Sequence, residues 1–445
     1  MTDGGVSAMH TLAFVDPGHF HAALILGERH PRVRDEIVIY AQQGQELDDF
    51  LTLVKAFNRR ADQPTSWRPV LRSGDLSIER LIAERPGDMV ILAGKNHRKM
   101  AMVRRLHDAG FHVLADKPWL AGADGLEDLR HTLAGGPLAM EMMTGRYDVT
   151  SILTERLVSE SEVFGGFDAE AAGPPAIQIS SVHHLEKTVD GRPLRRPAWF
   201  FDVRVQGDGI ADIPTHMVDQ VQRLFAAVSP AAATGSPPPL ELIAARTWAT
   251  QVPLTLFARV TGSPVFPSDL DTVVTGSELS YRGNAELSFR LGAVTAALHT
   301  RWDLSAPSGG GDTHRAVIRG TLAEIRVEQH AETGFRRRLT VIPRGNRNRM
   351  RAALERSVAS WQDGHPGLAV SEVGAGWEIR VPRPLDAGHE RHFPLVLADF
   401  LSRVERESLP EGLAANTLAK YTLLAHASAE ARRAGSPDPM WHFKT

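Results

Sequence analysis

The chain has 445 residues, no cysteine and a formal net charge of −3, with 50 basic and 53 acidic side chains. This length is more than a single hydrophobic core usually organises, so we expect two domains. The balanced charge gives no reason to expect a nucleic acid as a partner, because nucleic-acid-binding proteins usually carry a basic excess. Without cysteine, disulfides, thiolate metal sites and cysteine nucleophiles are excluded.

The sequence gives no sign of export or membrane insertion. Its first ten residues lack the basic start and apolar run of a signal peptide, and no stretch of about eighteen apolar residues is present that would cross a membrane. We therefore expect a cytoplasmic protein that has no membrane partner.

Residues 11–144 alternate short apolar runs with longer helix-like segments, the pattern of β-α-β units around a parallel sheet. The expected strands are Thr11–Asp16, Glu36–Ala41, Met89–Ala93, Phe111–Ala115 and Leu138–Met142. The expected helices are His21–Arg29, Glu46–Phe57, Ser77–Glu84, His97–Ala109 and Gly125–Leu133, and residues 58–74 read as a long loop. We predict an α/β domain over residues 1–150, a doubly wound parallel sheet of the Rossmann type.

The pattern changes after an expected helix at Tyr147–Glu160. Long strands separated by turn-rich stretches indicate a large, mostly antiparallel open sheet. These strands are Asp271–Arg282, Ala285–Asp303, Ala316–Gln329 and Arg338–Pro343. We predict an α+β domain over residues 151–445, in which two final helices, His389–Glu407 and Gly412–Ala434, could pack on either domain.

The turn after the first expected strand stands where a dinucleotide-binding fold places its phosphate loop. The usual fingerprint is G-x-G-x-x-G/A, because glycines let the backbone approach a pyrophosphate at a helix N-terminus. Here Gly18 is in place, Asp16 takes the position of the first glycine and His21 that of the third. The alternative is a Pro-Gly turn with two solvent-facing histidines, His19 and His21.

Two further polar groups follow expected strands at the sheet edge where open α/β sheets bind ligands. Asn96 could bind a cofactor or cap the next helix. Lys117, in Ala115-Asp116-Lys117-Pro118, could donate to a substrate hydroxyl and stabilise an alkoxide, or it could be an ordinary surface charge.

A fourth motif runs from Gly207 to Asp219. If a helix starts near Asp212, then His216 lies one turn later on the same face, where Asp212 could orient or tune an imidazole for proton transfer. The alternative is an aspartate helix cap followed by a structural histidine.

In this order and at these separations the four motifs resemble the Gfo/Idh/MocA family, named for glucose-fructose oxidoreductase and inositol dehydrogenase. Asn96 and Gly110–Pro118 resemble the family's Pro-Asn, Gly-x-x-Val and Glu-Lys-Pro run, with Asp116 in place of Glu. Residues 207–219 resemble its Asp-x-Gly-x-His segment, and Arg146-Tyr147 the start of its linking helix. Residues 16–24, 56–62 and 196–202 resemble a bacterial branch with its own type of oxidoreductase C-terminal domain.

The resemblance implies an NAD(P)-dependent oxidoreductase that transfers a hydride between a nicotinamide and a hydroxyl of a sugar, glycoside or polyol. The implied cofactor-binding residues are Asp16, Gly18, His19, Phe20, His21, Gln42, Gln43, Asn96, Asp116 and Lys117. The second expected strand is followed by Gln42 and Gln43, and by neither the usual ribose-binding acid nor an arginine for a 2′-phosphate. We expect NAD, with NADP as the alternative.

For catalysis the resemblance implies His216 as general base, Lys117 as stabiliser of the substrate oxygen and Asp212 as the residue that holds or tunes His216. The implied substrate-binding residues are Lys117, Arg146, His183, His184, Lys187, Asp212 and His216. We expect no metal, although His183, His184, Asp212 and His216 could instead collect zinc or manganese.

Two other functions remain open. An NAD-retaining enzyme that cleaves or epimerises glycosides through transient oxidation would use the same residues. A nonenzymatic sugar- or nucleotide-binding protein would fit the incomplete phosphate loop, whereas the set of Lys117, Asp212 and His216 argues against it. We expect a small carbohydrate as ligand and a homo-oligomer.

Overall fold

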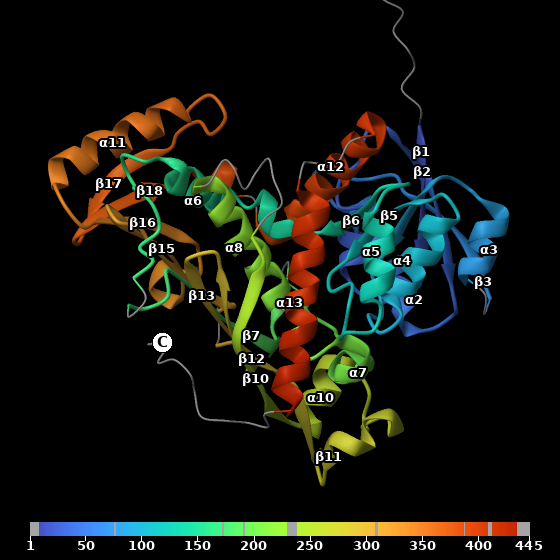
Figure 1. The fold of residues 1–445 in the computed structure, drawn as a ribbon. Coiled ribbons are helices and arrows are strands. Elements are labelled where there is room, and N and C mark those ends of the chain that lie inside the picture. The colour runs from blue at the N-terminus through green and yellow to red at the C-terminus, as the bar shows by residue number, and fades with distance from the viewer. Residues whose placement is uncertain are drawn as a thin grey trace, which may run out of the picture. The chain divides into compact units, whose positions relative to one another are not determined.

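The computed structural model describes residues 9–74, 77–170, 173–189, 192–228, 238–307, 310–386, 388–407 and 412–433. The contacts divide the chain into two compact units (Figure 1). Unit 1 comprises residues 1–120, 124–144 and 388–410, and unit 2 comprises residues 121–123, 145–387 and 411–445. Most of the N-terminal segment that was judged above to lack signal-peptide features lies outside the described residues.

Unit 1 contains a six-stranded parallel sheet in the order β3-β2-β1-β4-β5-β6. Its strands are β1 (His10–Val15), β2 (Val33–Ala41), β3 (Arg68–Ser73), β4 (Met89–Leu92), β5 (His112–Asp116) and β6 (Ala139–Met142). This is the strand order of the Rossmann fold, so the predicted fold class is confirmed. Every residue of β4 is buried, as expected for a central parallel strand covered on both faces.

Strand β3 corrects the expectation of a long loop over residues 58–74. It lies at the edge of the sheet, pairs only with β2 and has no buried residue. Pro69 stands in it, which edge strands tolerate because one side of such a strand needs no ladder hydrogen bond. The exposed, proline-containing strand gave no apolar run that sequence patterning could detect.

The helices of unit 1 come from two distant parts of the chain. The first part gives α1 (His21–Leu24), α2 (Gln45–Arg59), α3 (Ser77–Glu84), α4 (Lys99–Asp108) and α5 (Leu126–Leu133). The second gives α12 (His392–Arg406), which contacts β5, β6 and α1 (Figure 1). Phe393, Val396, Leu397, Phe400, Leu401 and Val404 are buried along one stripe of α12. Burial of this stripe covers part of the sheet that the N-terminal segment leaves open.

Unit 2 is built on a large sheet in the order β10-β12-β13-β7-β14-β15-β16-β18-β17, with β11 beside β12. Only the β7–β13 pair is parallel, so the predicted mostly antiparallel sheet is confirmed. The strands are β7 (Ile177–Glu186), β10 (Leu240–Pro253), β11 (Val274–Thr275), β12 (Glu278–Leu291), β13 (Val294–Ser305), β14 (Thr313–Arg319), β15 (Ala323–Gln329), β16 (Arg338–Pro343), β17 (Ala369–Val373) and β18 (Gly376–Arg380). A separate pair is formed by β8 (Thr188–Val189) and β9 (Arg192–Pro193).

Three expected strands are wrong in their limits. The expected strand Asp271–Arg282 starts inside a 3₁₀ helix (Ser268–Val273), includes β11 and the turn at Gly276, and ends inside β12. The expected strand Ala285–Asp303 contains a tight turn at Gly292, where φ is 60°, and so covers the second half of β12 and most of β13. The expected strand Ala316–Gln329 likewise spans the turn between β14 and β15. Short hairpin turns interrupt an apolar pattern for only two or three residues, so the pattern alone reads as one long strand.

The helices of unit 2 are α6 (Val149–Ser159), α7 (Val203–Gln206), α8 (Pro214–Val228), α10 (Leu254–Thr261), α11 (Arg347–Ser360) and α13 (Leu413–Arg433). The short 3₁₀ helices of this unit are η2 (Ala198–Phe201), η3 (Ser268–Val273), η4 (Ala331–Thr333) and η5 (Arg383–Leu385). η1 (Thr144–Tyr147) begins at the last residue of a unit 1 segment, and η6 (His389–Arg391) belongs to unit 1. α8 packs against β12 and β13, and α13 packs against α8 and β10. The last two long helices, α12 and α13, thus belong to different units.

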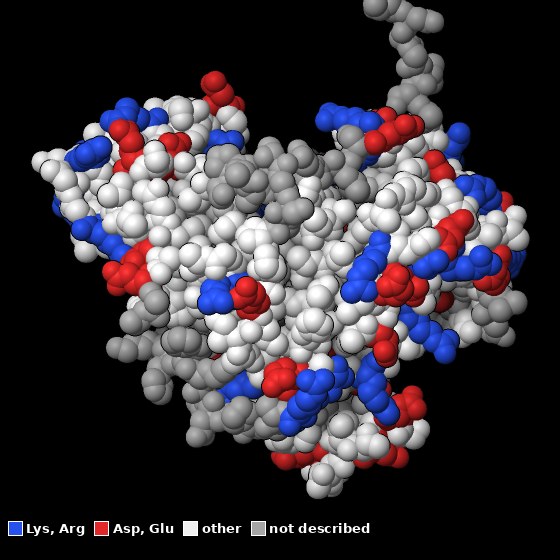
Figure 2. All heavy atoms as spheres, viewed as in Figure 1, with Lys and Arg blue, Asp and Glu red and all other residues white. Residues whose placement is uncertain are grey.

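Figure 2 shows acidic and basic side chains interspersed over the face in view, with neither sign dominating. This distribution agrees with the balanced composition of the sequence. Among the described residues, no helix combines the length and apolar character needed to cross a bilayer.

Candidate functional site

The carboxyl ends of the parallel strands bring four predicted cofactor-binding segments to one edge of the unit 1 sheet. Asp16 follows β1, Gln42 follows β2, Asn96 comes shortly after β4, and Lys117 follows β5. Gln42 and Gln43 are exposed, as a group that binds an external ligand must be before the ligand arrives. Open α/β sheets bind ligands at this edge.

Asp16 adopts a left-handed backbone conformation, with φ of 41°. Its carbonyl oxygen accepts a hydrogen bond from the Gly18 amide at 2.7 Å. A Cβ atom on Gly94 would lie 2.4 Å from that same oxygen, so only glycine fits there. The turn after β1 therefore packs backbone to backbone on the residues after β4, and Asp16 supplies the conformation that the missing glycine would give.

His19 and His21 both face the carboxylate of Asp116 at the end of β5. The distances from their Nδ1 atoms to Asp116 Oδ2 are 3.4 Å and 2.9 Å, and their side chains are 15% and 11% exposed. Burial alone would raise the pKa of Asp116, but the two imidazoles outweigh it and hold that pKa well below its usual range. Burial lowers the pKa of His19 to about 4. The alternative of two solvent-facing histidines is therefore wrong.

Residues near α12 complete the surroundings of His21. The His21 ring lies 4.6 Å from the ring of Phe393 and 6.0 Å from that of His389, centroid to centroid. The His389 Nε2 atom lies 3.2 Å from Thr144 Oγ1, at hydrogen-bond distance. Sequence reasoning missed both residues because they are far from the phosphate-loop turn along the chain, and only the return of α12 brings them there.

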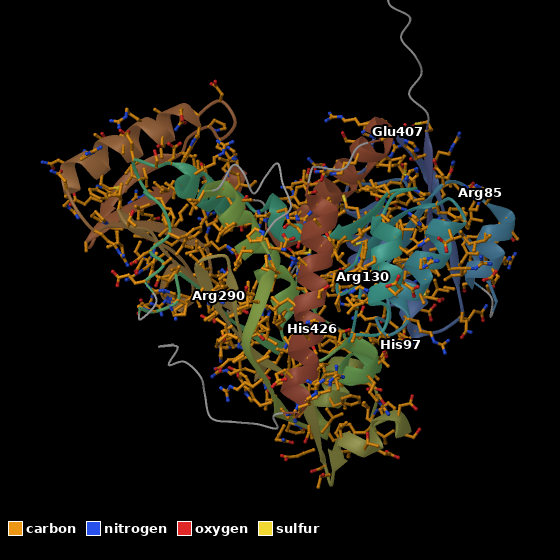
Figure 3. The ribbon with its side chains drawn as sticks, viewed as in Figure 1. Arg85, His97, Arg130, Arg290, Glu407 and His426 are labelled. Carbon is orange, nitrogen blue, oxygen red and sulfur yellow. The ribbon has the colours of Figure 1, made fainter. Side chains whose placement is uncertain are left out.

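Lys99 is 1% exposed and joins the ends of β4 and β5. Its ammonium group donates to Asn96 Oδ1 and, at 2.9 Å, to the carbonyl oxygen of Asp116. The helix α4 begins at Lys99 with Arg98 as its cap residue, so Asn96 does not cap it. The exposed neighbour His97 is labelled in Figure 3. The buried ammonium group of Lys99 thus holds the backbone just before Lys117. Lys117 is half-buried and is followed by a cis peptide bond to Pro118.

The Gly207–Asp219 motif lies in unit 2, where α8 begins at Pro214, two residues after Asp212. Asp208 braces the preceding turn, because its carboxylate accepts from the Ile210 amide at 3.1 Å and the Ser428 hydroxyl at 3.0 Å. A Cβ atom on Gly209 would lie 2.5 Å from the carbonyl oxygen of Asn284, so the glycine permits close contact with β12. Gly209 and Asp208 of this motif thus have structural roles.

Asp212 is 4% exposed and lies two residues before α8, whereas His216 is half-buried in the first turn of α8. The Asp212 charge acts on two buried groups. Burial and then Asp212 raise the pKa of Tyr281 well above its usual range. Burial lowers the pKa of Arg196, while Asp212 is among the charges that oppose this. Asp212 is therefore a buried acid in a region where charges interact strongly.

His183, His184 and Lys187 meet at the carboxylate of Asp312. The His183 and His184 Nδ1 atoms lie 3.1 Å and 3.3 Å from it, and the Lys187 ammonium group also donates to it. Burial would raise the pKa of Asp312, but His183 above all holds it well below its usual range. Sequence reasoning missed Asp312, which stands in a glycine-rich loop. The antiparallel register of β7 and β14, with Val182 opposite Thr313, brings it to the histidines.

Arg146 forms a bidentate ion pair with Asp219, with N···O distances of 3.1 Å and 2.6 Å. Lys420 of α13 lies 3.4 Å from the same carboxylate. Burial would raise the pKa of Asp219, but Arg146 and Lys420 hold it far below its usual range. Arg146 thus ties η1 to α8 and α13, and its role as a substrate contact stays a prediction.

Among the described residues, the alternative metal set of His183, His184, Asp212 and His216 does not form a group with metal-ligand spacing. Of the predicted catalytic residues, Lys117 belongs to unit 1, and Asp212 and His216 belong to unit 2.

Residues 153–432 match the family model described as "Putative oxidoreductase C terminal domain". A crystal structure of an oxidoreductase from Parabacteroides merdae, titled "putative", has 32% identity and a TM-score of 0.91, over 97% of this chain and 100% of that one. The chain belongs to this family of oxidoreductases. The predicted resemblance to the Gfo/Idh/MocA oxidoreductases is confirmed by the family domain together with the shared fold.

More distant solved structures share the fold of this oxidoreductase. GenD2 from gentamicin A biosynthesis, in complex with NAD, has 12% identity and a TM-score of 0.58, with 98% of each chain covered. Levoglucosan dehydrogenase, in complex with NADH and L-sorbose, has 13% identity and a TM-score of 0.56, over 95% of this chain and 97% of that one. No curated protein matches the sequence.

Proposed function

We propose that this oxidoreductase transfers a hydride between a nicotinamide cofactor, NAD in preference to NADP, and a hydroxyl of a sugar, glycoside or polyol. The observation that carries the proposal is the Rossmann sheet of unit 1, with Asn96, Asp116 and Lys117 at its carboxyl edge. Structures of the same fold that hold NAD, or NADH with a sugar, support the choice of cofactor and substrate class.

The residues at this edge fit a dinucleotide. The left-handed Asp16 and the close approach at Gly94 form the tight turn that a phosphate loop needs. Gln42 and Gln43 are exposed after β2, and their amides suit the ribose hydroxyls of NAD. Asp16, Gly18, His19, Phe20, His21, Asn96, Asp116 and Lys117 complete the proposed set. When bound, the nicotinamide ring supplies the hydride donor or acceptor.

The protein's own groups manage the proton. His216 is the proposed general base that accepts the hydroxyl proton, and Asp212 is the proposed positioning residue that favours the charged imidazole. Lys117 donates to the substrate oxygen as negative charge develops on it. The half-buried state of Lys117 favours this role over that of an ordinary surface charge.

In unit 2 the proposed sugar-binding group is the Asp312 cluster, consisting of His183, His184, Lys187 and Asp312. Sugar hydroxyls both donate and accept hydrogen bonds, so a carboxylate next to imidazole and ammonium donors matches them. Asp312 also accepts from the His184 amide at 3.1 Å, which fixes the carboxylate on β7.

Mass spectrometry of nucleotide released from denatured protein, followed by turnover assays on a panel of sugars and polyols, tests the proposal. We expect NAD in the purified protein, NADH accumulation with at least one substrate, and a raised KM for that substrate in Asp312→Asn. Turnover of a glycoside without net NADH would support the transient-oxidation enzyme instead. The absence of both bound nucleotide and turnover with NAD or NADP would refute the proposal. The variant Gly18→Val tests the nucleotide site directly, because it should stay folded but lose the nucleotide.

A further inference from the structure

Three residues of unit 1 that the proposed function assigns to cofactor binding also form a group of possible metal ligands. One atom each from His19, His21 and Asp116 lies within 4.8 Å of the others. Both imidazole Nδ1 atoms face the same oxygen, Asp116 Oδ2. The Nδ1 atom of His19 is buried, and its contact with Asp116 Oδ2 at 3.4 Å does not have hydrogen-bond geometry. Nearly all buried polar atoms make a hydrogen bond, so a buried nitrogen that faces a carboxylate without one leaves room for a ligand shared by the two groups.

The spacing suits a small divalent cation. Zinc binds imidazole nitrogen at about 2.0–2.1 Å and carboxylate oxygen at about 2.0–2.2 Å, so neighbouring ligands of a tetrahedral site lie about 3.4 Å apart. The two observed nitrogen-to-oxygen distances are 3.4 Å and 2.9 Å. Both distances lie within about half an ångström of this ligand separation, and all three ligand atoms lie within 4.8 Å of one another.

The donor atoms are of the right chemical type and are held in place. Two imidazoles and one carboxylate are typical ligands of zinc and of ferrous iron. The ring of His21 is packed against Phe20 and Phe393, with centroids 4.5 Å and 4.6 Å away. Lys99 donates to the carbonyl oxygen of Asp116, which fixes the backbone of the carboxylate ligand. Supporting contacts of this kind accompany most protein metal sites.

We propose that His19, His21 and Asp116 bind one divalent transition-metal ion, of which zinc is the expected example. Three protein ligands leave a fourth position open, the arrangement that catalytic zinc sites have and structural ones lack. An ion with an open position can bind water or polarise a substrate oxygen. Metal binding by these residues goes beyond the proposed hydride transfer, although the proposed function also assigns all three to the cofactor.

The test is titration of the chelator-treated full chain with Zn²⁺ alone, by calorimetry and without nucleotide. We expect one tight ion per chain and, with Co²⁺ in its place, the visible absorption of tetrahedral cobalt. His21→Gln and Asp116→Asn should weaken binding by about a hundredfold or more, since even loss of a residue that supports a ligand costs about 10–100-fold. The matched control is Asp108→Asn in the more exposed group of His107, Asp108 and His131, which should bind as the unmodified chain does.

Asp116 is 4% exposed, so its replacement could disturb folding. His19→Gln is the second variant, because that side chain is 15% exposed and its Nδ1 atom makes only the 3.4 Å contact with Asp116 described above. Circular dichroism verifies that each variant is folded. Three outcomes would each overturn the proposal. The unmodified chain could bind no tight ion, the folded His19 and His21 variants could bind it with unchanged affinity, or Asp108→Asn could lose it. Because no turnover is measured, these outcomes are independent of the dehydrogenase assay.

Discussion

Asp16 illustrates how a single side chain can replace an expected glycine. Its φ of 41° lies in the region that glycine enters freely and that most other residues avoid. Aspartate tolerates this region better than bulky residues do, because its short polar side chain can bond locally. The chain therefore keeps the turn after β1 without the first glycine of the usual fingerprint.

Substitutions at Asp16 test this interpretation. Asp16→Gly should change the free energy of unfolding by less than about 1 kcal/mol, because relief of strain is offset by greater freedom of the unfolded chain. Asp16→Val should cost about 2 kcal/mol or more, because a β-branched residue at positive φ is strained. Urea unfolding measures both. Equal stability of the two variants would show that the turn imposes no such constraint.

The proposed catalytic residues differ from surface charges in what their loss should change. Lys117→Ala and His216→Ala should each lower kcat by about a hundredfold or more, with little change in nucleotide affinity. Asp212→Asn should also lower kcat, because it removes the charge that favours the protonated imidazole. Lys95→Ala, a lysine that is 50% exposed, is the control and should keep normal turnover. Near-normal kcat in both alanine variants would exclude the proposed site.

At the scale of elements, α12 decides how the parallel sheet is covered. It lies against β5 and β6, and the residues before it bring His389 to the ring of His21. A helix from the far end of the chain thus supplies both core packing and part of the surroundings of the candidate site.

Phe400 provides the clearest test of this packing because it is fully buried. Phe400→Ala should lower the free energy of unfolding by about 3–5 kcal/mol, the usual cost of an aromatic cavity. Leu395→Ala on the same helix, where the side chain is 47% exposed, should cost about 0.5 kcal/mol or less. Chemical denaturation compares the two, and a similar cost for both would contradict the packing described.

The sequence predicted the parallel sheet well because its buried strands are continuous apolar runs, as β4 shows. It could not predict β3, whose exposed edge position gives no apolar pattern, or the turn inside the strand expected at Ala285–Asp303. At the candidate site it singled out His183, His184 and Lys187 but not Asp312, because strand register brings that residue to them. Lys99 was missed because nothing in the sequence distinguishes a buried lysine from a surface one.

At the scale of the whole molecule, a partly buried histidine should make stability depend on pH. Burial, and then Arg337, lower the pKa of His314 from 6.5 to about 3. Below the unfolded value the unfolded chain therefore takes up a proton that the folded chain does not, so stability falls as pH drops through this window. Asp116, Asp219 and Asp312, whose pKa values are lowered, lose their stabilising effect only below the ordinary aspartate pKa of 3.8.

His314→Gln isolates this effect. Between pH 7.5 and pH 5 the unmodified chain should lose about 2 kcal/mol more unfolding free energy than the variant, since each pKa unit corresponds to about 1.4 kcal/mol. Urea unfolding at the two pH values gives the difference. Parallel losses in both proteins would mean that His314 takes up its proton equally in the folded and unfolded chains.

The return of α12 to unit 1 also matters while the protein is being made. All six strands of the parallel sheet leave the ribosome before residue 145, whereas the helix that covers β5 and β6 begins only at His392. During that interval an apolar surface of the nascent chain stays without its final cover, in a state that favours chaperone binding or aggregation. Unit 1 therefore begins to form early in synthesis but is completed only after most of unit 2 has been made. A message truncated before α12 would yield a chain that cannot cover β5 and β6.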